Sequence, residues 1–274
     1  MTSIAGRHAV ITGGSSGIGL ATAIALAAKG ARVTVVARRP EPLAAAVAEL
    51  RGRGADAAAV ELDVSDREAV GRTFAEIVSD RAPVDILVCS AGVARPGYFE
   101  ELPDEVFREM IEIDYFGTLW PIREVVPAMV ERGSGSIVGI SSDVGLIGVY
   151  GYTAYAAAKF AVRGLLESLR GELAPHGVHV GCCYPPDTDT PQLAWEDQFK
   201  PDETRAISAT FKAIQPEQVA DCIVTGIERE RFALMPDLGS RLLAVGAGLA
   251  PGVITSVMDR TVRKAQRARG SDQP

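Results

Sequence analysis

A glycine-rich loop near the start of the chain lies between an apolar run and an alanine-rich segment. His8–Thr12 is typical of a short buried strand, and Leu20–Lys29 has the composition of a helix that Gly30 stops. Glycines between a strand and a helix allow a tight turn, and the free amides of the helix N-terminus face an anion. This order predicts a seat for the phosphates of a dinucleotide, rather than a turn without a ligand. The residues expected to form it are Gly13, Ser15, Ser16, Gly17, Ile18 and Gly19.

Two arginines follow the second predicted strand. That strand is Arg32–Ala37, and Arg38 and Arg39 come directly after it. An acidic residue at this place would bond the ribose 2′-hydroxyl of NAD, whereas an arginine accommodates the 2′-phosphate of NADP. The sequence therefore favours NADP(H), and the alternative is that both arginines are solvated surface charges.

Strand-like and helix-like segments alternate along the rest of the chain. Helices are expected at Leu43–Arg51, from about Asp104 to Arg132 and from Gly151 to about His176, and further strands at Ala57–Leu62, Val84–Val88, Ser136–Ser142 and Val178–Tyr184. Pro121 and Pro127 are expected to kink or break the second of these helices. Alternation of this kind predicts parallel pairing with right-handed crossovers. We expect an α/β fold, a Rossmann-type doubly wound, mostly parallel sheet flanked by helices in a single domain.

Ligands of such a sheet bind at the carboxyl ends of its strands. Asp63, Cys89, Ser142 and Pro185 fall at such ends, as does the glycine loop. Asp63 is placed to bond an adenine amino group, while a nearby aspartate, Asp66, is better explained as a helix cap.

Tyr155 and Lys159 lie four residues apart in the alanine-rich helix, so they share one face. A phenol titrates near ~10 when unperturbed, and a neighbouring ammonium favours the phenolate. The spacing alone is more typical of a surface pair, because it arises often by chance. It indicates an acid–base pair only when other features agree.

Composition excludes several functions. The 274 residues carry a net charge of -7, which argues against nucleic-acid binding. No CxxC pair is present and there are 3 histidines, so no metal site is predicted. The apolar setting of Cys182 and Cys183 predicts buried, reduced thiols. Because no basic segment followed by a long apolar run opens the chain, we expect a cytoplasmic protein.

The order of these features resembles the short-chain dehydrogenase/reductase superfamily over nearly the whole chain to about residue 235. The matching pieces are Thr12–Gly19, Asp63-Val64, Ala91-Gly92, Ser142, Tyr155-x-x-x-Lys159 and Pro185 to Thr190. The resemblance implies that Ser142 holds a substrate carbonyl and that Tyr155 donates the proton. It further implies that Lys159 lowers the pKa of Tyr155 and binds the nicotinamide ribose, and that the protein forms a homodimer or homotetramer. The other cofactor contacts that it implies are Asp63, Val64, Ala91, Gly92, Pro185, Thr188 and Thr190.

Two positions depart from the family pattern. Asp114 stands where the family carries an asparagine that helps to hold a water leading to the lysine. We expect Asp114 to belong to the catalytic group while adding negative charge. The loop after the fourth strand begins Cys89-Ser90 in place of asparagine, which puts its side-chain bonds to the cofactor or neighbouring strand in doubt.

A narrower resemblance follows the catalytic helix. Tyr184–Pro191, with its Pro-Pro pair, is similar to the 3-ketodihydrosphingosine reductase subgroup, as are Lys200–Arg205 and Pro216–Ala220. This implies NADPH-dependent reduction of a long-chain sphingoid ketone. Reduction of another bulky ketone, a steroid or a 3-oxoacyl chain, is the first alternative. A non-catalytic NADP(H)-binding sensor or scaffold is the second.

The end of the chain predicts a tail at residues 238–274, after a dinucleotide-binding and catalytic domain at residues 1–237. Residues 191–215 are too polar and irregular for a core and suit a substrate lid. Leu242–Met258 carries no charge, and five basic residues follow between residues 260 and 269. Such a tail is typical of peripheral attachment to anionic lipid. The alternative is that it packs over the substrate mouth or a partner subunit.

Overall fold

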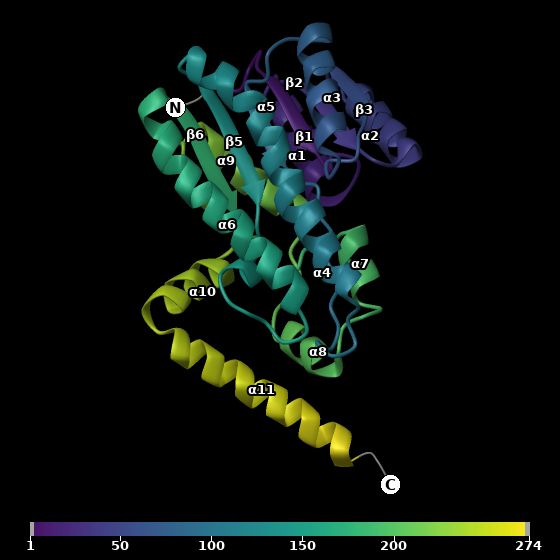
Figure 1. The fold of residues 1–274 in the computed structure, drawn as a ribbon, viewed down its shortest axis with the longest axis vertical. Helices are drawn as coiled ribbons and strands as arrows, with labels where there is room; N and C mark the ends of the chain where they lie inside the picture. The colour runs from purple at the N-terminus through teal and green to yellow at the C-terminus, as the bar shows by residue number, and fades with distance from the viewer. Residues whose placement is uncertain (1–2, 272–274) are drawn as a thin grey trace.

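The fold is built on a sheet of seven parallel strands in the order β3-β2-β1-β4-β5-β6-β7 (Figure 1). The computed structural model describes residues 3–271. The strands are β1 (His8–Thr12), β2 (Arg32–Ala37), β3 (Ala57–Glu61), β4 (Ile86–Cys89), β5 (Gly135–Ile140), β6 (Val178–Cys183) and β7 (Ala233–Leu234). The strand order reverses between β1 and β4, which is where a doubly wound sheet opens a crevice for a ligand. The predicted α/β class is confirmed.

Helices cover both faces of the sheet. On one face pack α1 (Gly17–Ala28), α2 (Pro40–Gly52) and α9 (Pro216–Glu228), and on the other α3 (Arg67–Asp80), α5 (Gly117–Glu131) and α6 (Thr153–Leu173). Neighbouring residues of β1 enter different cores: Ala9 and Ile11 pack with the first group of helices, and Val10 with the second. Because both faces are covered, β1, β4 and β6 are buried at every position instead of alternating between buried and exposed.

The segment expected as one helix from Asp104 to Arg132 is divided, but not by its prolines. It comprises α4 (Asp104–Met110), a π-helical turn η1 (Ile111–Phe116) and α5, which continues through Pro121 and Pro127. The expected break at the prolines is therefore wrong. The π-helical turn carries Asp114, and turns of this kind are frequent at functional sites.

The expected lid contains α7 (Pro191–Glu196) and α8 (Asp202–Ser208). The expectation that it is too polar and irregular to be core is wrong, because several polar side chains in it are buried: Glu196, Lys200, Glu203 and Thr204. Thr204, for example, donates a hydrogen bond to the carbonyl of Tyr150 at 2.8 Å. Internal hydrogen bonds and ion pairs compensate for the burial that composition alone argues against.

Two helices end the described chain, α10 (Leu238–Leu249) and α11 (Pro251–Ser271). They meet at an angle of 117°, and α11 runs beneath the body of the molecule in Figure 1. Within residues 3–271, no single helix is long and apolar enough to cross a membrane. Taken together, the two bent helices reach the length and apolar composition of a membrane span. Residues 272–274 of the predicted tail lie outside the described residues, as does the side chain of Arg269.

Candidate active site

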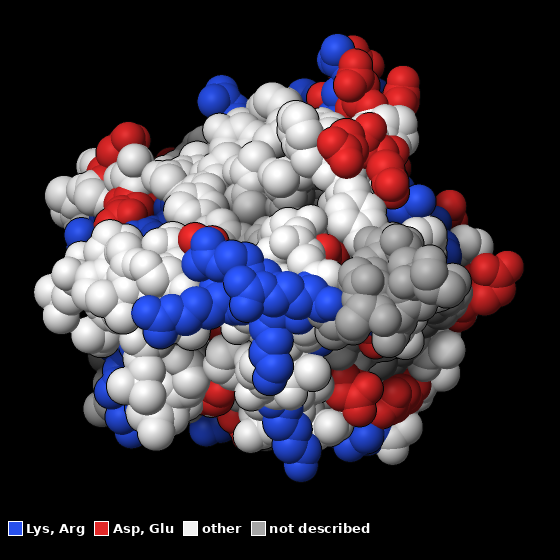
Figure 2. Space-filling view, turned by 90° about the horizontal axis from the view of Figure 1, so that it is seen from below, with Lys and Arg blue, Asp and Glu red and all other residues white. Residues whose placement is uncertain are grey.

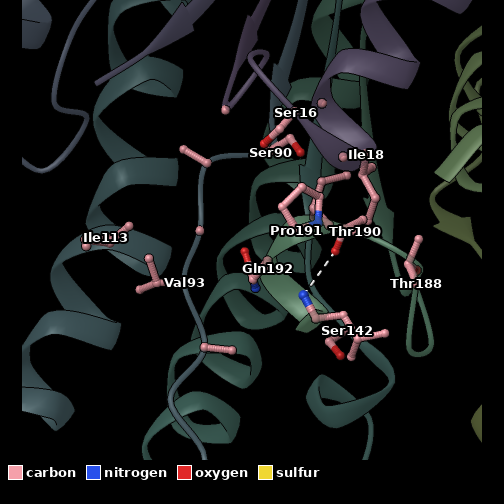
Figure 3. Close-up of a pocket in the computed structure, with 18 of the residues that line it drawn as sticks. Ser16, Ile18, Ser90, Val93, Ile113, Ser142, Thr188, Thr190, Pro191 and Gln192 are labelled. Carbon is pink, nitrogen blue, oxygen red and sulfur yellow. Dashed lines mark hydrogen bonds between the residues drawn. The ribbon is translucent and has the colours of Figure 1, made fainter. Parts of the chain in front are cut away.

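A cavity of 640 Å³ opens along the carboxyl ends of the central strands. It brings together every predicted cofactor residue and three of the four predicted catalytic residues. Figure 3 shows the contributing loops, with Ser16 and Ile18 from the start of α1, Ser90 and Val93 after β4, and Ser142 after β5. The predicted residues that line it are Gly13, Ser15, Ser16, Gly17, Ile18, Gly19, Arg38, Arg39, Asp63, Val64, Ala91, Gly92, Ser142, Tyr155, Lys159, Pro185, Thr188 and Thr190.

The glycine loop is a close-fitting cradle. Gly13 has a φ of +67°, and a Cβ added there would lie 2.6 Å from the backbone of Ser90 and Ala91. A Cβ on Gly19 would lie 2.3 Å from the carbonyl oxygen of Gly13. The side chain of Ser16 makes no capping bond at the start of α1. The first amides of α1 therefore stay available to an anion, which is what a dinucleotide pyrophosphate needs.

Thr12 ties two loops of the cradle together, a role that the sequence analysis missed. Its Oγ1 accepts a hydrogen bond from the backbone amide of Ala91 at 3.3 Å, and its carbonyl accepts one from Ser90. The Cys89 thiol is buried and faces the carbonyl of Thr118, on α5. The loop after β4 is thus fixed by backbone groups and by Thr12, although it lacks the asparagine of the family.

The arginines after β2 reach the adenosine end of the cavity. Arg38 Nη1 lies 3.6 Å from Asp63 Oδ2, and both side chains are partly exposed. The other oxygen of Asp63 accepts hydrogen bonds from the amide and hydroxyl of Ser65. Burial alone would raise the pKa of Asp63, but the bonds from Ser65 and the charge of Arg38 outweigh it and hold that pKa below its usual value. Asp63 therefore stays ionised beside a cation that can meet a phosphate.

Asp114 does not line the cavity but lies directly behind Lys159. Its Oδ1 is 3.3 Å from Lys159 Nζ and accepts a hydrogen bond from the amide of Val93 at 3.1 Å. The ammonium also donates to the carbonyl of Ile140 at 3.1 Å. Asp114 is 0% exposed, and burial raises its pKa despite the ion pair. Where the family has a neutral amide, this chain has a buried carboxylate paired with the lysine.

Gly92 makes room for this ion pair. A Cβ at Gly92 would lie 2.5 Å from Asp114 Oδ1 and 3.3 Å from Lys159 Nζ. A larger residue would therefore push apart the two charged groups. The Ala91-Gly92 pair is thus explained by the ion pair behind it as well as by the cavity in front.

The pKa of Tyr155 is raised well above its usual value, chiefly by burial and then by the negative charges of Asp114 and Glu196. The net direction is opposite to the fall that was expected from the neighbouring Lys159 ammonium. The Lys159 ammonium lies 5.4 Å from the Tyr155 ring centroid, but its charge is balanced by Asp114. A hydrogen bond between Ser142 and Tyr155 opposes the shift without reversing it. Tyr155 is therefore held as the neutral phenol, the form that can donate a proton.

The loop after β6 closes the cavity opposite the glycine cradle. Ser142 Oγ faces the carbonyl of Pro185 at 3.5 Å, and the amide of Asp143 bonds that same carbonyl at 3.0 Å. Thr190 caps α7 by accepting a hydrogen bond from the amide of Leu193 at 3.2 Å. Its methyl group also lies close to Gly17, so the β6 loop and the glycine loop meet across the cavity.

Several lining residues were not anticipated from the sequence. Tyr152 comes directly before α6 and its ring contacts that of Tyr155, three positions later, a spacing that could have been noticed. Glu196 and Gln192 come from the expected lid, where no motif marked them, and Asp187 comes from the Tyr184–Pro191 segment, where no role was assigned to it. The remaining unanticipated residues at this end are largely apolar: Val93, Ala94, Met110, Ile113, Leu193 and Trp195.

The family model described as short chain dehydrogenase matches residues 7–200. Among curated proteins, the chain is similar to the 3-ketodihydrosphingosine reductase of Bos taurus, with 41% identity over 260 residues, 93% of this chain and 78% of that protein. It is also similar to the 3-ketodihydrosphingosine reductase of Dictyostelium discoideum, with 40% identity over 266 residues, 90% of this chain and 79% of that protein.

A solved structure agrees with this assignment. The chain resembles an actinorhodin polyketide ketoreductase variant crystallised with NADPH, with a TM-score of 0.76 and 32% identity over 86% of this chain and 97% of that one. The glycine cradle, the strand-end serine and the tyrosine–lysine helix lie within the span that the family model matches. By its matching family model, its relatives and its fold, the chain belongs to the short-chain dehydrogenase family.

Proposed function

We propose that this protein reduces the 3-keto group of 3-ketosphinganine to the hydroxyl of sphinganine with NADPH, a step of sphingolipid biosynthesis. The observation that carries the proposal is one cavity that joins a dinucleotide cradle and two arginines to Ser142, Tyr155 and Lys159. Relatives with 40 and 41% identity over at least 90% of the chain are named for this reaction.

The residues of the chain fit a dinucleotide at one end of this cavity. In the proposal, the amides of the Gly13–Gly19 loop hold the pyrophosphate, and Arg38 and Arg39 meet the 2′-phosphate. The nicotinamide end lies toward Lys159, Pro185 and the Thr188–Thr190 segment. When bound, NADPH supplies the hydride, while the protein supplies position and electrostatics.

The ketone binds beside Tyr155 at the other end. Ser142 donates a hydrogen bond to the carbonyl oxygen and orients it. As hydride adds to the carbonyl carbon, the Tyr155 O–H bond breaks and its proton passes to that oxygen. Burial and the charges of Asp114 and Glu196 raise the pKa of Tyr155, which favours the neutral phenol, the form that carries the proton.

Lys159 and Asp114 act behind the tyrosine. Lys159 has three N–H donors, of which two face Ile140 and Asp114. The third can reach the cofactor ribose or the phenolate left after proton transfer. We assign to Asp114 the role of positioning Lys159 through their ion pair.

An NADPH-oxidation assay tests the function. Purified protein is mixed with 3-ketosphinganine, with a 3-oxoacyl ester and with a steroid ketone. We expect 3-ketosphinganine to give the highest kcat/KM, and a higher value for either rival would transfer the assignment to that ketone. Tyr155→Phe is expected to lose at least about 10²-fold in kcat, since a positioned proton donor contributes about that much or more, while keeping its affinity for NADPH. Binding of NADPH without turnover of any ketone would favour the sensor.

For the tail, we propose peripheral contact with an anionic lipid surface. Four large apolar side chains of α10 are exposed at helical spacing: Leu238, Leu242, Val245 and Leu249. Val253 and Val257 of α11 are exposed as well. The charged side chains beyond them are also exposed: Arg260, Arg263, Lys264 and Arg267. Figure 2 shows Lys and Arg gathered on the face seen from below. An apolar stripe beside a basic cluster suits an anionic interface.

The same helices also support the alternative, because α11 lies against α8 and Ser240 donates a hydrogen bond to Asp143 at 3.1 Å. Co-sedimentation with liposomes that contain phosphatidylserine separates the two. We expect the wild type to pellet with them and the double variant Leu242→Asp, Leu249→Asp to remain in solution with unchanged turnover of soluble short-chain ketones. Equal binding by both proteins, or by neither, would contradict lipid contact.

Three further proposals follow from the sequence expectations. We propose a cytoplasmic protein that associates peripherally with membrane, a homodimer or homotetramer as the family resemblance implies, and a boundary at residue 237 between the catalytic domain and the tail. Light scattering on the purified protein measures the number of subunits. A monomer at micromolar concentration would contradict the second proposal.

A further inference from the structure

A buried carboxylate lies at the substrate end of the cavity. The Glu196 side chain projects from α7, is only 8% exposed and lines the same cavity as Tyr155 and Lys159. Its Oε2 accepts a hydrogen bond from the hydroxyl of Tyr152 at 3.1 Å, and its Oε1 accepts one from the amide of Gln192 at 3.3 Å. Both donors are neutral, so neither balances a negative charge.

Among the described residues, no cation is paired directly with Glu196. Within the part of the chain that the structure describes, no lysine or arginine nitrogen lies within 4 Å of its carboxylate. Lys200 is the nearby cation, but its ammonium bonds Asp197 at 2.7 Å and lies 3.6 Å from Asp187. Burial raises the pKa of Glu196 to about 7, and the repulsion of Asp187 opposes the attraction of Lys200. A buried carboxylate without a cationic partner is costly, and a cation that entered the cavity would relieve that cost.

The carboxylate is separated from the proposed proton donor by one aromatic ring. The Tyr152 ring contacts the Tyr155 ring with centroids 5.7 Å apart, and its hydroxyl bonds Glu196. The charge of Glu196 also reaches Tyr155, whose pKa it helps to raise. Figure 3 places Gln192, the second partner of Glu196, in the space between Val93 and Ser142. A ketone held by Ser142 and Tyr155 therefore presents its neighbouring carbon to this corner of the cavity.

Much of the cavity lining near Glu196 is apolar, in contrast to its carboxylate. The lining also includes Met110, Trp195, Ile113 and Val93, and Figure 3 shows the last two across from Gln192. The substrate end thus combines an apolar wall with the buried acid Glu196, while the acids Asp187 and Glu109, which also line the cavity, are less buried, with Asp187 half-buried and Glu109 exposed. This suits a molecule with a hydrocarbon chain on one side of the ketone and a cation on the other.

We propose that Glu196 recognises the protonated amine on the carbon next to the substrate ketone, so that the site selects 2-amino ketones over ketones without an amine. The inference rests on the proposed function and adds its specificity element. The amine would take the place between Glu196 and the carbonyl, exchanging a neutral hydrogen bond for an ion pair. Glu196 contributes to binding and orientation, while Ser142 and Tyr155 carry the chemistry.

Steady-state NADPH oxidation with two matched ketones tests this. One is 3-ketosphinganine, and the other is the same chain with hydrogen in place of the amine. A charge-assisted hydrogen bond is worth about 1.5 to 3 kcal/mol, so the wild type should show a KM about 10- to 100-fold higher for the ketone without the amine. Glu196→Gln should raise the KM for 3-ketosphinganine by a similar factor, with little change in kcat and none in the KM of the other ketone.

Glu172→Gln is the matched control, because it makes the same change at an exposed site on α6, away from the cavity. It should leave both KM values unchanged. Equal wild-type KM values for the two ketones would overturn the inference alone, even if Glu196→Gln did not fold. Equal losses in Glu196→Gln for both ketones would also overturn it, because they would indicate a general packing role. Absence of turnover with either ketone would overturn the proposed function and the inference together.

Discussion

The two ends of the cavity handle charge in opposite ways. At the nucleotide end, the anion seat is made of backbone amides in the Gly13–Gly19 loop and of the exposed cations Arg38 and Arg39. At the substrate end, the charged groups are buried side chains, with Asp114 paired to Lys159 and Glu196 held by neutral donors. Backbone amides bind an anion only while the loop keeps its shape, so the nucleotide end tolerates no added side-chain volume. The buried acids depend instead on the charges and hydrogen-bond donors around them. Mutations at the two ends should therefore fail for different reasons.

The largest effect should come from adding volume to the nucleotide end. Gly19→Ala places a methyl group 2.3 Å from the carbonyl of Gly13, so the loop must shift. Overpacking of this kind costs about 1 to 3 kcal/mol of stability, and the displaced amides should weaken NADPH binding about 100-fold or more. Isothermal titration and thermal melts measure both. Gly52→Ala adds the same methyl group where nothing lies within 4 Å, and a similar loss there would refute the steric explanation.

Removing charge at the nucleotide end should change cofactor choice without harming the fold. In the double variant Arg38→Ala, Arg39→Ala, we expect the KM for NADPH to rise about 10- to 100-fold, the value of a charge-assisted bond, with little change for NADH. Arg72→Ala on α3 is the control, since its side chain is exposed and pairs only weakly with Glu68. If the KM values for NADPH and NADH rose equally, the arginines would not recognise the 2′-phosphate.

At the substrate end, Asp114→Asn tests the buried ion pair. The amide can keep the bond from Val93 but carries no charge, so the pKa of Tyr155 should fall. The high-pH limb of the kcat profile, where the phenol loses its proton, should then move to lower pH. Glu112→Gln changes an exposed acid of the same π-helical turn and should leave the profile in place. An unchanged profile in Asp114→Asn would show that its charge does not act on Tyr155.

The smallest effect should appear in the pH dependence of stability through Glu196. Its pKa of about 7 in the folded protein exceeds the ordinary value of 4.5, so the native state binds more protons between those values. Stability therefore falls as pH rises through this window, by at most about 3 kcal/mol in all. Glu196→Gln lacks this loss, and its Tm relative to the wild type should be several degrees higher at pH 8 than at pH 4.5. A Tm difference that is the same at both pH values would contradict the burial argument.

Much of the nucleotide end could be predicted from the sequence because it is local. The glycine loop, the strand before it and the helix after it are contiguous, and the arginines come at the end of the next strand. Tyr155 and Lys159 were predictable for the same reason, since helical spacing puts them on one face. The strand limits were predicted within two residues for β1, β2 and β3.

The substrate end was harder to predict because its groups come from distant segments. Glu196 accepts a hydrogen bond from Tyr152, 44 positions away in the sequence, and Tyr98 donates one to Glu203, 105 positions away. A polar segment such as residues 191–215 gives no pattern of apolar periodicity, so its buried acids resemble surface charges in sequence. The π-helical turn that carries Asp114 also has no recognisable sequence signal. The prolines do have one, so the break was predicted there instead.

The sequence by itself determined the parallel sheet, the dinucleotide cradle and the identity of Ser142, Tyr155 and Lys159, because those features depend on short-range spacing and on the fixed position of strand ends. Only the tertiary structure decided the electrostatics around them. It set Asp114 against Lys159, raised the pKa of Tyr155 where the isolated pair predicts a fall, and buried Glu196 without a cation. The reason is physical: a charge's energy depends on its burial and its partners in space, and chain folding alone sets these.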